Sequence, residues 1–261
     1  MTSKKAMNKR FFNKVVVGKV ENILPKIEDC SIDLIIADPP FNKGKHYDGY
    51  DDNMSEEDYM NWVDAWIKEG FRVLKDTGSF WIYCPSSLLG NFQTIGKQYG
   101  MWQNTVCWNY IYGSVPDEKR LPKIWSAWLF FSKTDKFQFF AEFHKSIESI
   151  TTRRKNINSK FSDVWDDIPK LVGGYLAQSE VLLYPKTKKR ICVYQLPILL
   201  LKRIIGLCSQ EGDLVLDLFS HSGTTSTAAK IMNRNYLAID QSKKYCEIIE
   251  GRINKLSKTL L

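Results

Sequence analysis

The stretch SIDLIIADPPF, residues 31–41, decides the fold of this chain. Its apolar run, Ser31–Ala37, is short and passes directly into a stiff polar turn, a pattern that predicts a buried parallel β-strand. In open α/β sheets, ligands bind beyond the carboxyl ends of the strands. We therefore expect Asp38-Pro39-Pro40-Phe41 to lie at a functional site.

The rest of the chain repeats this pattern. Other short apolar runs predict strands at Lys14–Val17, Gly78–Cys84, Asp213–Phe219 and Tyr236–Ile239. Amphipathic segments with helix-start and helix-stop residues predict helices at Ser55–Leu74, Pro197–Ser209, Thr224–Asn233 and Lys243–Leu256. Strands that alternate with helices indicate an α/β fold with a doubly wound, mostly parallel sheet.

The middle of the chain differs, because basic and aromatic stretches interrupt the alternation. We interpret residues 112–190 as a lobe inserted between two halves of one α/β domain, residues 1–111 and 191–261. The chain has 37 Lys and Arg against 29 Asp and Glu, a net charge of +8. This charge suits a nucleic-acid partner, although a solvated basic surface would give the same balance. The candidate phosphate contacts are Lys119, Arg120, Lys123, Arg153, Arg154, Lys186, Lys188, Lys189 and Arg190.

Other features exclude several classes of protein. No apolar run approaches the ~18 residues that cross a bilayer, and Val15–Val17 is too short for the core of a signal peptide. The six cysteines are scattered, with no C-x-x-C pair and no nearby histidines, so we expect neither a metal site nor disulfides. We expect a cytoplasmic protein.

The tetrapeptide Asp38-Pro39-Pro40-Phe41 suits the binding of an exocyclic amino group. The Asp38 carboxylate and the Pro39 carbonyl can accept both amino hydrogens, which orients the nitrogen lone pair toward an electrophile. Phe41 offers a flat face on which a base can stack. The alternative is a Pro-Pro turn in which Asp38 caps a backbone group and Phe41 joins the core.

A second motif, Asp217-Leu218-Phe219-Ser220-His221-Ser222-Gly223-Thr224-Thr225, joins a buried strand to a helix. Asp240 follows at the end of the next predicted strand, where an acidic residue can hold ribose hydroxyls. The motif has only one glycine, so it leaves no room for a pyrophosphate and disfavours a dinucleotide. An adenosine that carries a carboxylate and an amine, as in S-adenosylmethionine, fits better, because a helix N-terminus can receive the carboxylate. By itself, Asp240 is equally compatible with a solvated acid at a strand end.

Taken together, the two motifs make the chain resemble the permuted β-group of DNA amino-methyltransferases, which modify N6 of adenine or N4 of cytosine. In that group the D-P-P-[YF] half comes first, a target-recognition region follows, and the cofactor half closes the chain. The resemblance implies a Rossmann-like methyltransferase fold with residues 112–190 as the target-recognition region. It also implies that Asp38 contacts both the flipped base and the cofactor. The implied cofactor-binding set is Asp38, Asp217, Phe219, His221, Ser222, Gly223, Thr224, Thr225 and Asp240.

Three segments depart from the family pattern. His221 stands where a glycine is commonest, and Gly18-Lys19 replaces an early Gly-Asp. The H-P-T-Q-K-P segment is reduced to Cys192–Pro197, which keeps Gln195 and Pro197.

The resulting expectation is direct methyl transfer from S-adenosylmethionine to N6 of an adenine flipped out of duplex DNA. Phe41 would stack on the base, with Trp108 as a candidate for the opposite wall and Asn42–Asn53 as a loop over it. The Asp that opens the tetrapeptide favours adenine over cytosine within the family. N4-cytosine methylation, a non-catalytic DNA-binding partner, and methylation of RNA or protein stay open. A homodimer and a cognate restriction endonuclease are further partners that the sequence does not decide.

Overall fold

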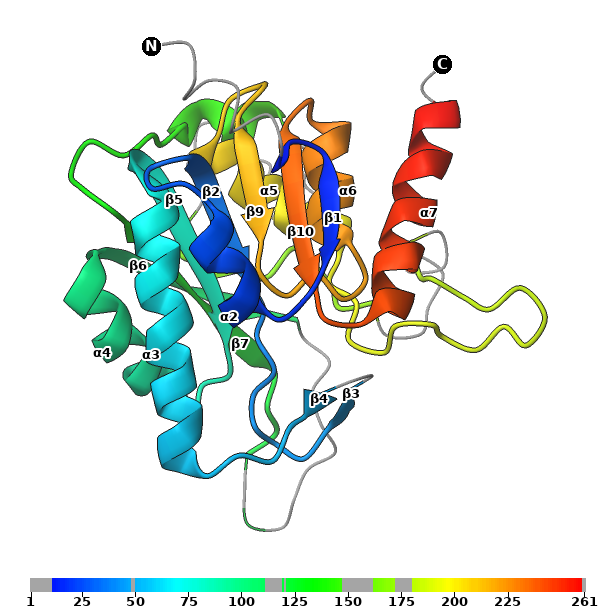
Figure 1. Ribbon diagram of the computed structural model, residues 1–261, viewed down its shortest axis with the longest axis horizontal. Coiled ribbons are helices and arrows are strands. Elements are labelled where there is room, and N and C mark those ends of the chain that lie inside the picture. Colours follow the sequence, from blue (N-terminus) through cyan, green and yellow to red (C-terminus); the bar gives the residue numbers. More distant parts are fainter. Residues whose placement is uncertain are drawn as a thin grey trace.

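The structure is a computed structural model that describes residues 11–47, 50–110, 119, 121–146, 162–171 and 180–259. These residues form an eight-stranded sheet with the order β1-β10-β9-β2-β5-β7-β6-β8 and a small two-stranded ribbon, β3-β4 (Figure 1). The strands of the main sheet are β1 (Lys14–Val17), β2 (Ile32–Ala37), β5 (Leu74–Cys84), β6 (Met101–Asn109), β7 (Trp125–Ser132), β8 (Val164–Trp165), β9 (Leu214–Asp217) and β10 (Asn235–Asp240). The ribbon consists of β3 (His46–Tyr47) and β4 (Tyr50–Asp51).

Helices cover both faces of the main sheet. They are α2 (Val20–Ile23), α3 (Glu56–Val73), α4 (Leu89–Tyr99), α5 (Ile198–Cys208), α6 (Thr224–Ile231) and α7 (Lys243–Thr259), with 3-10 turns at Leu24–Lys26 and Ala141–Ser146. α2, α3 and α4 lie on the near face in Figure 1, and α5 and α6 lie behind the sheet. This arrangement confirms the predicted doubly wound α/β fold. None of the helices in the described ranges has the length and apolar character needed to cross a bilayer.

The core has two layers because side chains alternate along each strand. On β2, Ile35 faces the layer shared with α3 and α4, while Leu34 and Ile36 face the layer shared with α5. All three side chains are buried. The strand is therefore a continuous apolar run, as expected for a parallel strand that is covered on both faces.

The sheet extends further than the sequence patterns indicate. β1, β10, β9, β2 and β5 are mutually parallel, whereas β7 is antiparallel to both β5 and β6. β7 and β8 both lie within residues 112–190, so the ten residues of these two strands belong to the central sheet. The role of residues 112–190 in target recognition stays a prediction.

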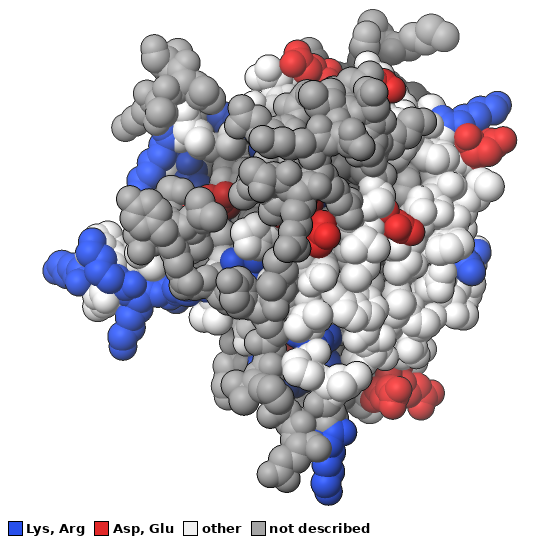
Figure 2. All heavy atoms as spheres, turned by 180° about the vertical axis from the view of Figure 1, so that it is seen from behind, with Lys and Arg blue, Asp and Glu red and all other residues white. Residues whose placement is uncertain are grey.

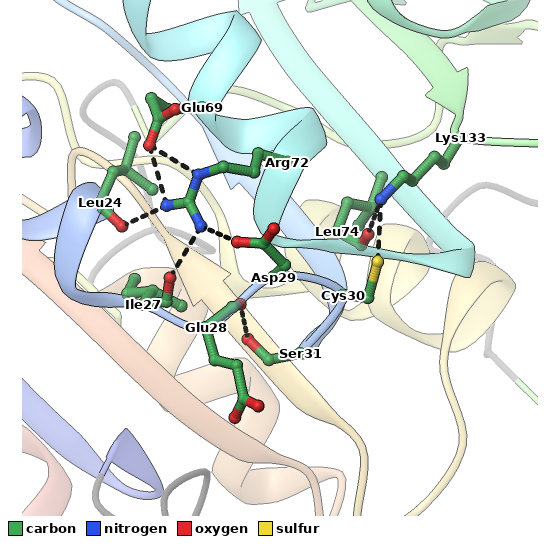
Figure 3. Close-up of polar contacts among 10 residues, drawn as sticks. All are labelled: Leu24, Ile27, Glu28, Asp29, Cys30, Ser31, Glu69, Arg72, Leu74 and Lys133. Carbon is green, nitrogen blue, oxygen red and sulfur yellow. Dashed lines mark hydrogen bonds and ion pairs between the residues drawn. The ribbon is translucent and has the colours of Figure 1, made fainter. Parts of the chain in front are cut away.

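Arg72, in the last turn of α3, stabilises the edge of the sheet at which β2 and β5 begin (Figure 3). Its guanidinium donates to the carbonyl oxygens of Ile27 (3.0 Å) and Leu24 (2.8 Å) and pairs with Glu69 and Asp29. These contacts hold the chain that enters β2 against the helix that precedes β5.

Candidate active site

The two sequence motifs meet at the carboxyl edge of the sheet. β2 and β9 are neighbours, with Ile36 opposite Asp217, and the Leu218 amide donates to the Ile36 carbonyl at 3.2 Å. The chain leaves these two strands in opposite directions, toward β5 and toward β10, which makes this the switch point where α/β sheets bind ligands. A cavity of about 540 Å³ opens there and is lined by residues of both motifs.

Asp38, Pro39, Pro40 and Phe41 all line this cavity. The Pro40 carbonyl accepts a hydrogen bond of 2.8 Å from the Tyr59 hydroxyl of α3, which fixes the turn. Removal from bulk water, together with the charge of nearby Asp217, raises the pKa of Asp38 well above its usual value. The turn therefore presents a carboxyl group that holds its proton more tightly than an exposed aspartate does.

Aromatic side chains form the wall beside Asp38. The ring of Tyr83, at the end of β5, lies 5.9 Å from that of Phe41 and 6.2 Å from that of Trp108. Trp108 lines the cavity, and its indole nitrogen donates to the Ile168 carbonyl at 2.7 Å. Such a wall suits a planar, mostly apolar ligand group.

The segment 162–171 completes this wall. Asp167 forms a bidentate pair with buried Arg203 of α5, with distances of 2.8 and 2.6 Å. Two residues of the segment, Lys170 and Leu171, line the cavity, and the Lys170 ammonium lies 3.6 Å from the centre of the Tyr110 ring. The buried ion pair thus anchors the segment that places the Lys170 cation in the lining of the cavity.

The loop that follows Phe41 is organised around the buried carboxylate of Asp52. This carboxylate accepts hydrogen bonds from the backbone amides of Asn42 (2.8 Å), Lys43 (2.9 Å) and Lys45 (3.0 Å). Both lysines and Asp52 line the cavity. The loop therefore has a defined shape at the cavity rim.

Residues of the cofactor motif line the same cavity as the aromatic wall. Asp217 is buried, and burial raises its pKa from the usual value to about 7, although hydrogen bonds from Thr225 and from the Phe219 amide oppose the shift. Phe219 lines the large cavity and packs against Trp62 of α3, with ring centres 5.6 Å apart. Asp38 and Asp217 together place two carboxyl groups with raised pKa values on neighbouring strand ends.

The remaining predicted cofactor residues divide between two spaces. His221 and Asp240 line the large cavity. Asp217 and the hydroxyl residues Ser222, Thr224 and Thr225 line an adjoining pocket of about 20 Å³, and Gly223 lines neither space. The small pocket has room for about one water molecule.

The backbone explains the unusual residue types of this turn. His221 has φ = 38° and Gly223 has φ = 69°, both in the left-handed region that favours glycine. His221 tolerates this conformation with two supports: its amide donates to the Asp240 carboxylate at 2.8 Å, and its ring packs 4.6 Å from the ring of Tyr245. Burial lowers the pKa of His221 to about 4, so its imidazole is neutral at pH 7.

The described residues include six of the nine predicted phosphate contacts, and these six lie in two separate segments of the chain. Lys119 is exposed, whereas Lys123 is partly buried, and its burial, followed by the charges of nearby Lys43 and Lys170, lowers its pKa. Lys186, Lys188 and Lys189 are exposed on a hairpin, and Arg190 at its base lines the cavity. This hairpin projects beside α7 in Figure 1, and Figure 2 shows cations gathered on the same projection. Arg120, Arg153 and Arg154 lie outside the described residues.

Several cavity residues were not predicted from the sequence. They include Trp62, Tyr83, Lys170, Leu171 and Tyr245. Gly18, Lys19 and Tyr194 also line the cavity and lie in segments that depart from the family pattern, and Lys43 and Lys45 lie in the loop 42–53 that was expected over the base. Tyr83 had a usable signal, because it lies at the carboxyl end of a predicted strand. In the described part of the chain, no group of three or more His, Cys, Asp or Glu side chains is arranged to hold a metal ion.

Comparison with known proteins agrees with this geometry. Residues 32–251 match the DNA methylase family. The chain is 30% identical to the Type II methyltransferase M.HpaI of Haemophilus parainfluenzae, over 92% of this chain and 74% of that protein. It is 28% identical to the DNA adenine methyltransferase YhdJ of Escherichia coli, over 95% of this chain and 86% of that protein.

Solved structures show the same fold. A DNA modification methylase from Thermus thermophilus, solved in complex with S-adenosyl-L-methionine, matches with a TM-score of 0.63 and 20% identity, covering 93% of each chain. The cytosine-N4-specific PvuII DNA methyltransferase matches with a TM-score of 0.66 and 18% identity, covering 94% of this chain and 90% of that one. The matched region includes both motifs at the cavity, and the chain belongs to the family of N6-adenine and N4-cytosine DNA methylases.

Proposed function

We propose that this protein methylates DNA, transferring a methyl group from S-adenosylmethionine to N6 of an adenine that is flipped out of the duplex. The observation that supports this most is the meeting of the two motifs. The tetrapeptide Asp38–Phe41 at the end of β2 and the turn after β9 line one cavity of about 540 Å³. A cavity of this size accommodates a nucleoside-sized ligand next to a second planar group.

The residues at the cavity fit S-adenosylmethionine, which supplies a methyl group on a positively charged sulfonium. Asp38 and Asp217 are carboxyl groups removed from bulk water, and a nearby cation favours their charged forms. Asp240 stands at the end of β10, where an acid can accept hydrogen bonds from ribose hydroxyls. The turn from Asp217 to Thr225 and the Phe219 ring complete this half of the site.

The other half of the site suits a flipped base. The carboxyl group of Asp38 and the Pro39 carbonyl accept the two amino hydrogens and so orient the nitrogen lone pair. The Pro40 carbonyl already accepts a hydrogen bond from the Tyr59 hydroxyl. The Pro39 carbonyl is therefore the one proposed to accept an amino hydrogen of the substrate. Stacking on the rings of Phe41 and Tyr83 would recover part of the cost of unstacking the base, at ~1–3 kcal/mol per stacked base. The amino nitrogen would displace the sulfonium sulfur from the methyl carbon, leaving S-adenosylhomocysteine, and Asp38 would accept the proton that the nitrogen loses.

Adenine is the proposed target because Asp opens the tetrapeptide. The similar protein YhdJ is a DNA adenine methyltransferase, which supports the same choice. Cytosine N4 is the second candidate target, because the fold is also similar to that of the cytosine-N4-specific PvuII enzyme. A homodimer and a partner endonuclease stay predictions.

The first test is nucleoside mass spectrometry of unmethylated DNA incubated with the protein and S-adenosylmethionine. We expect N6-methyladenine with the wild type and none with Asp38→Ala, because the variant cannot orient the amino group. Asp135→Ala, which removes an exposed carboxyl group, is the matched control and should keep activity. N4-methylcytosine would overturn the choice of base. No methylated base, with cofactor still bound, would favour a DNA-binding protein without catalysis.

The pH dependence of the reaction tests the role of Asp38 separately. Only the ionised carboxylate can accept both an amino hydrogen and, later, a proton, and its raised pKa keeps it protonated to higher pH than an ordinary aspartate. Single-turnover rates should therefore rise with pH, by about tenfold per pH unit on the acid limb. A rate that is flat from pH 5 to pH 8 would contradict this role.

A further inference from the structure

Leu121 is the most exposed large apolar side chain described, with 94% of its surface open to solvent. An isolated exposed leucine needs no explanation by itself. The position of Leu121 in the fold is informative, because the residue belongs to the connection between β6 and β7.

The connection between β6 and β7 leaves the sheet at the edge that carries the site. β7 is antiparallel to β5, with Ala127 opposite Cys84, so β7 begins where β5 ends. The Tyr110 amide donates to the Ile124 carbonyl at 3.0 Å, which closes the base of the connection next to the aromatic wall. Leu121 therefore stands at the same edge of the sheet as the cavity.

The surroundings of Leu121 are cationic. Lys123, two residues further along the chain, is near enough to Lys43 and Lys170 for their charges to lower its pKa, and both of those lysines line the cavity. Lys119, two residues before Leu121, is exposed. Leu121, with the less exposed Ile124 (39%) three residues further on, is thus an apolar group between lysines at the edge of the sheet that carries the aromatic cavity. Duplex DNA has the matching chemistry, because its anionic phosphates enclose an apolar stack of bases.

We propose that Leu121 inserts into the base stack of duplex DNA at the position that the flipped base vacates. Apolar side chains are known to enter opened base steps in this way, flanked by cations that neutralise the phosphates. The lysines around Leu121 hold the backbone on either side of the extruded nucleotide, while the side chain replaces the lost stacking contact. This inference rests on the proposed function, because it needs a flipped base.

The test compares Leu121→Ala with Leu121→Phe on two synthetic duplexes that carry the methylation site located by sequencing the product DNA. One duplex is fully paired, and the other has a mismatch at the target base. On the paired duplex we expect kcat/KM to fall about tenfold to a hundredfold for Leu121→Ala, the loss expected for a leucine removed from an apolar contact. Leu121→Phe, which keeps a large apolar side chain, should retain most of the activity.

On the mismatched duplex the same variant should come within about threefold of the wild type, because a mismatched base flips at the least cost. Met101→Ala is the matched control: Met101 is also exposed (47%), but it starts β6 at the opposite edge of the sheet. A second readout is the fluorescence of 2-aminopurine at the target position, which rises when the base leaves the stack and should rise less with Leu121→Ala.

Two outcomes overturn the proposal. Equal loss on paired and mismatched duplexes would show that Leu121 acts in binding rather than in base flipping, and no loss on either would show that it does not enter the DNA. Both require an active wild-type protein. Absence of methylation by the wild type would instead contradict the proposed function, so the two failures are distinguishable.

Discussion

Replacing Asp217 by Asn should stabilise the protein at neutral and higher pH. The buried carboxyl group has a pKa of about 7 against an ordinary value of 3.8, because burial disfavours its charged form. Each pKa unit corresponds to ~1.36 kcal/mol, so ionising this group in the folded state costs up to about 4 kcal/mol of unfolding free energy. An asparagine can still accept a hydrogen bond from the Phe219 amide, which now donates to Asp217 at 3.2 Å.

The sign of the effect follows from the two pKa values. Below about pH 4 the group is protonated in both folded and unfolded states, and it costs nothing. As the pH rises from about 4 to about 7, the unfolded chain ionises while the folded protein keeps its proton, so the stability of the wild type falls relative to the variant. Above pH 7 the group is ionised in both states, and the full cost of burying its charge is subtracted from the unfolding free energy. The gap between variant and wild type should therefore be largest at pH 8 and close toward pH 4.

Urea denaturation followed by tryptophan fluorescence, at several pH values and without cofactor, measures this gap. Asp135→Asn, at an exposed position, should show a small gap that does not change with pH. The reasoning fails if Asp217→Asn is the less stable protein at pH 8, or if its gap from the wild type is independent of pH.

Three further predictions concern the supports of the site. Asp167→Asn leaves the guanidinium of Arg203 buried with half of its partner lost and should lower the unfolding free energy by about 3–5 kcal/mol; a loss below about 1 kcal/mol in urea titrations would refute the buried pair. His221→Gly should be about 1–2 kcal/mol more stable than His221→Ala, because only glycine adopts φ = 38° without strain, and equal midpoints in thermal unfolding would contradict this. Gly96→Ala would place a Cβ 2.4 Å from the buried ring of Phe131 and should cost about 1–3 kcal/mol, measured in the same way; an unchanged midpoint would show that α4 can shift to make room.

Local patterns predicted most of the sheet because its parallel strands are covered on both faces. β2 begins one residue later than predicted and ends at the predicted residue, and β10 is one residue longer than predicted at each end. β5 begins four residues earlier than expected, at Leu74, because α3 passes into it without a loop. Boundaries of this kind depend on hydrogen bonds to neighbouring strands, which a local pattern does not contain.

The antiparallel pair β6–β7 escapes prediction for a related reason. β7 is almost completely buried, and its apolar run suits the anchors of an inserted lobe as well as it suits a strand. β6 is exposed over much of its length and mixes tryptophans with polar residues, so it lacks the signature of a buried strand. Whether such segments join the central sheet depends on strand order, which is set by contacts between distant residues.

The site residues also differ in whether local sequence patterns could predict them. The residues that follow β2 and β9 were predicted because ligands bind at the carboxyl ends of strands. Lys170 was not, because it reaches the cavity through the ion pair between Asp167 and Arg203, whose members are 36 residues apart. No sequence pattern within residues 162–171 indicates that Asp167 pairs with Arg203.

The pairing of β2 with β9 also has a consequence for biosynthesis. The two strands that carry the site are joined by the bond from the Leu214 amide to the Asp33 carboxylate, between residues 181 positions apart in the chain. A ribosome therefore exposes β2, with one backbone edge unpaired, long before its neighbour has been made. Unpaired strand edges of this kind are where nascent chains aggregate. Until β9 emerges, this edge of β2 is open to pairing with a strand of another chain.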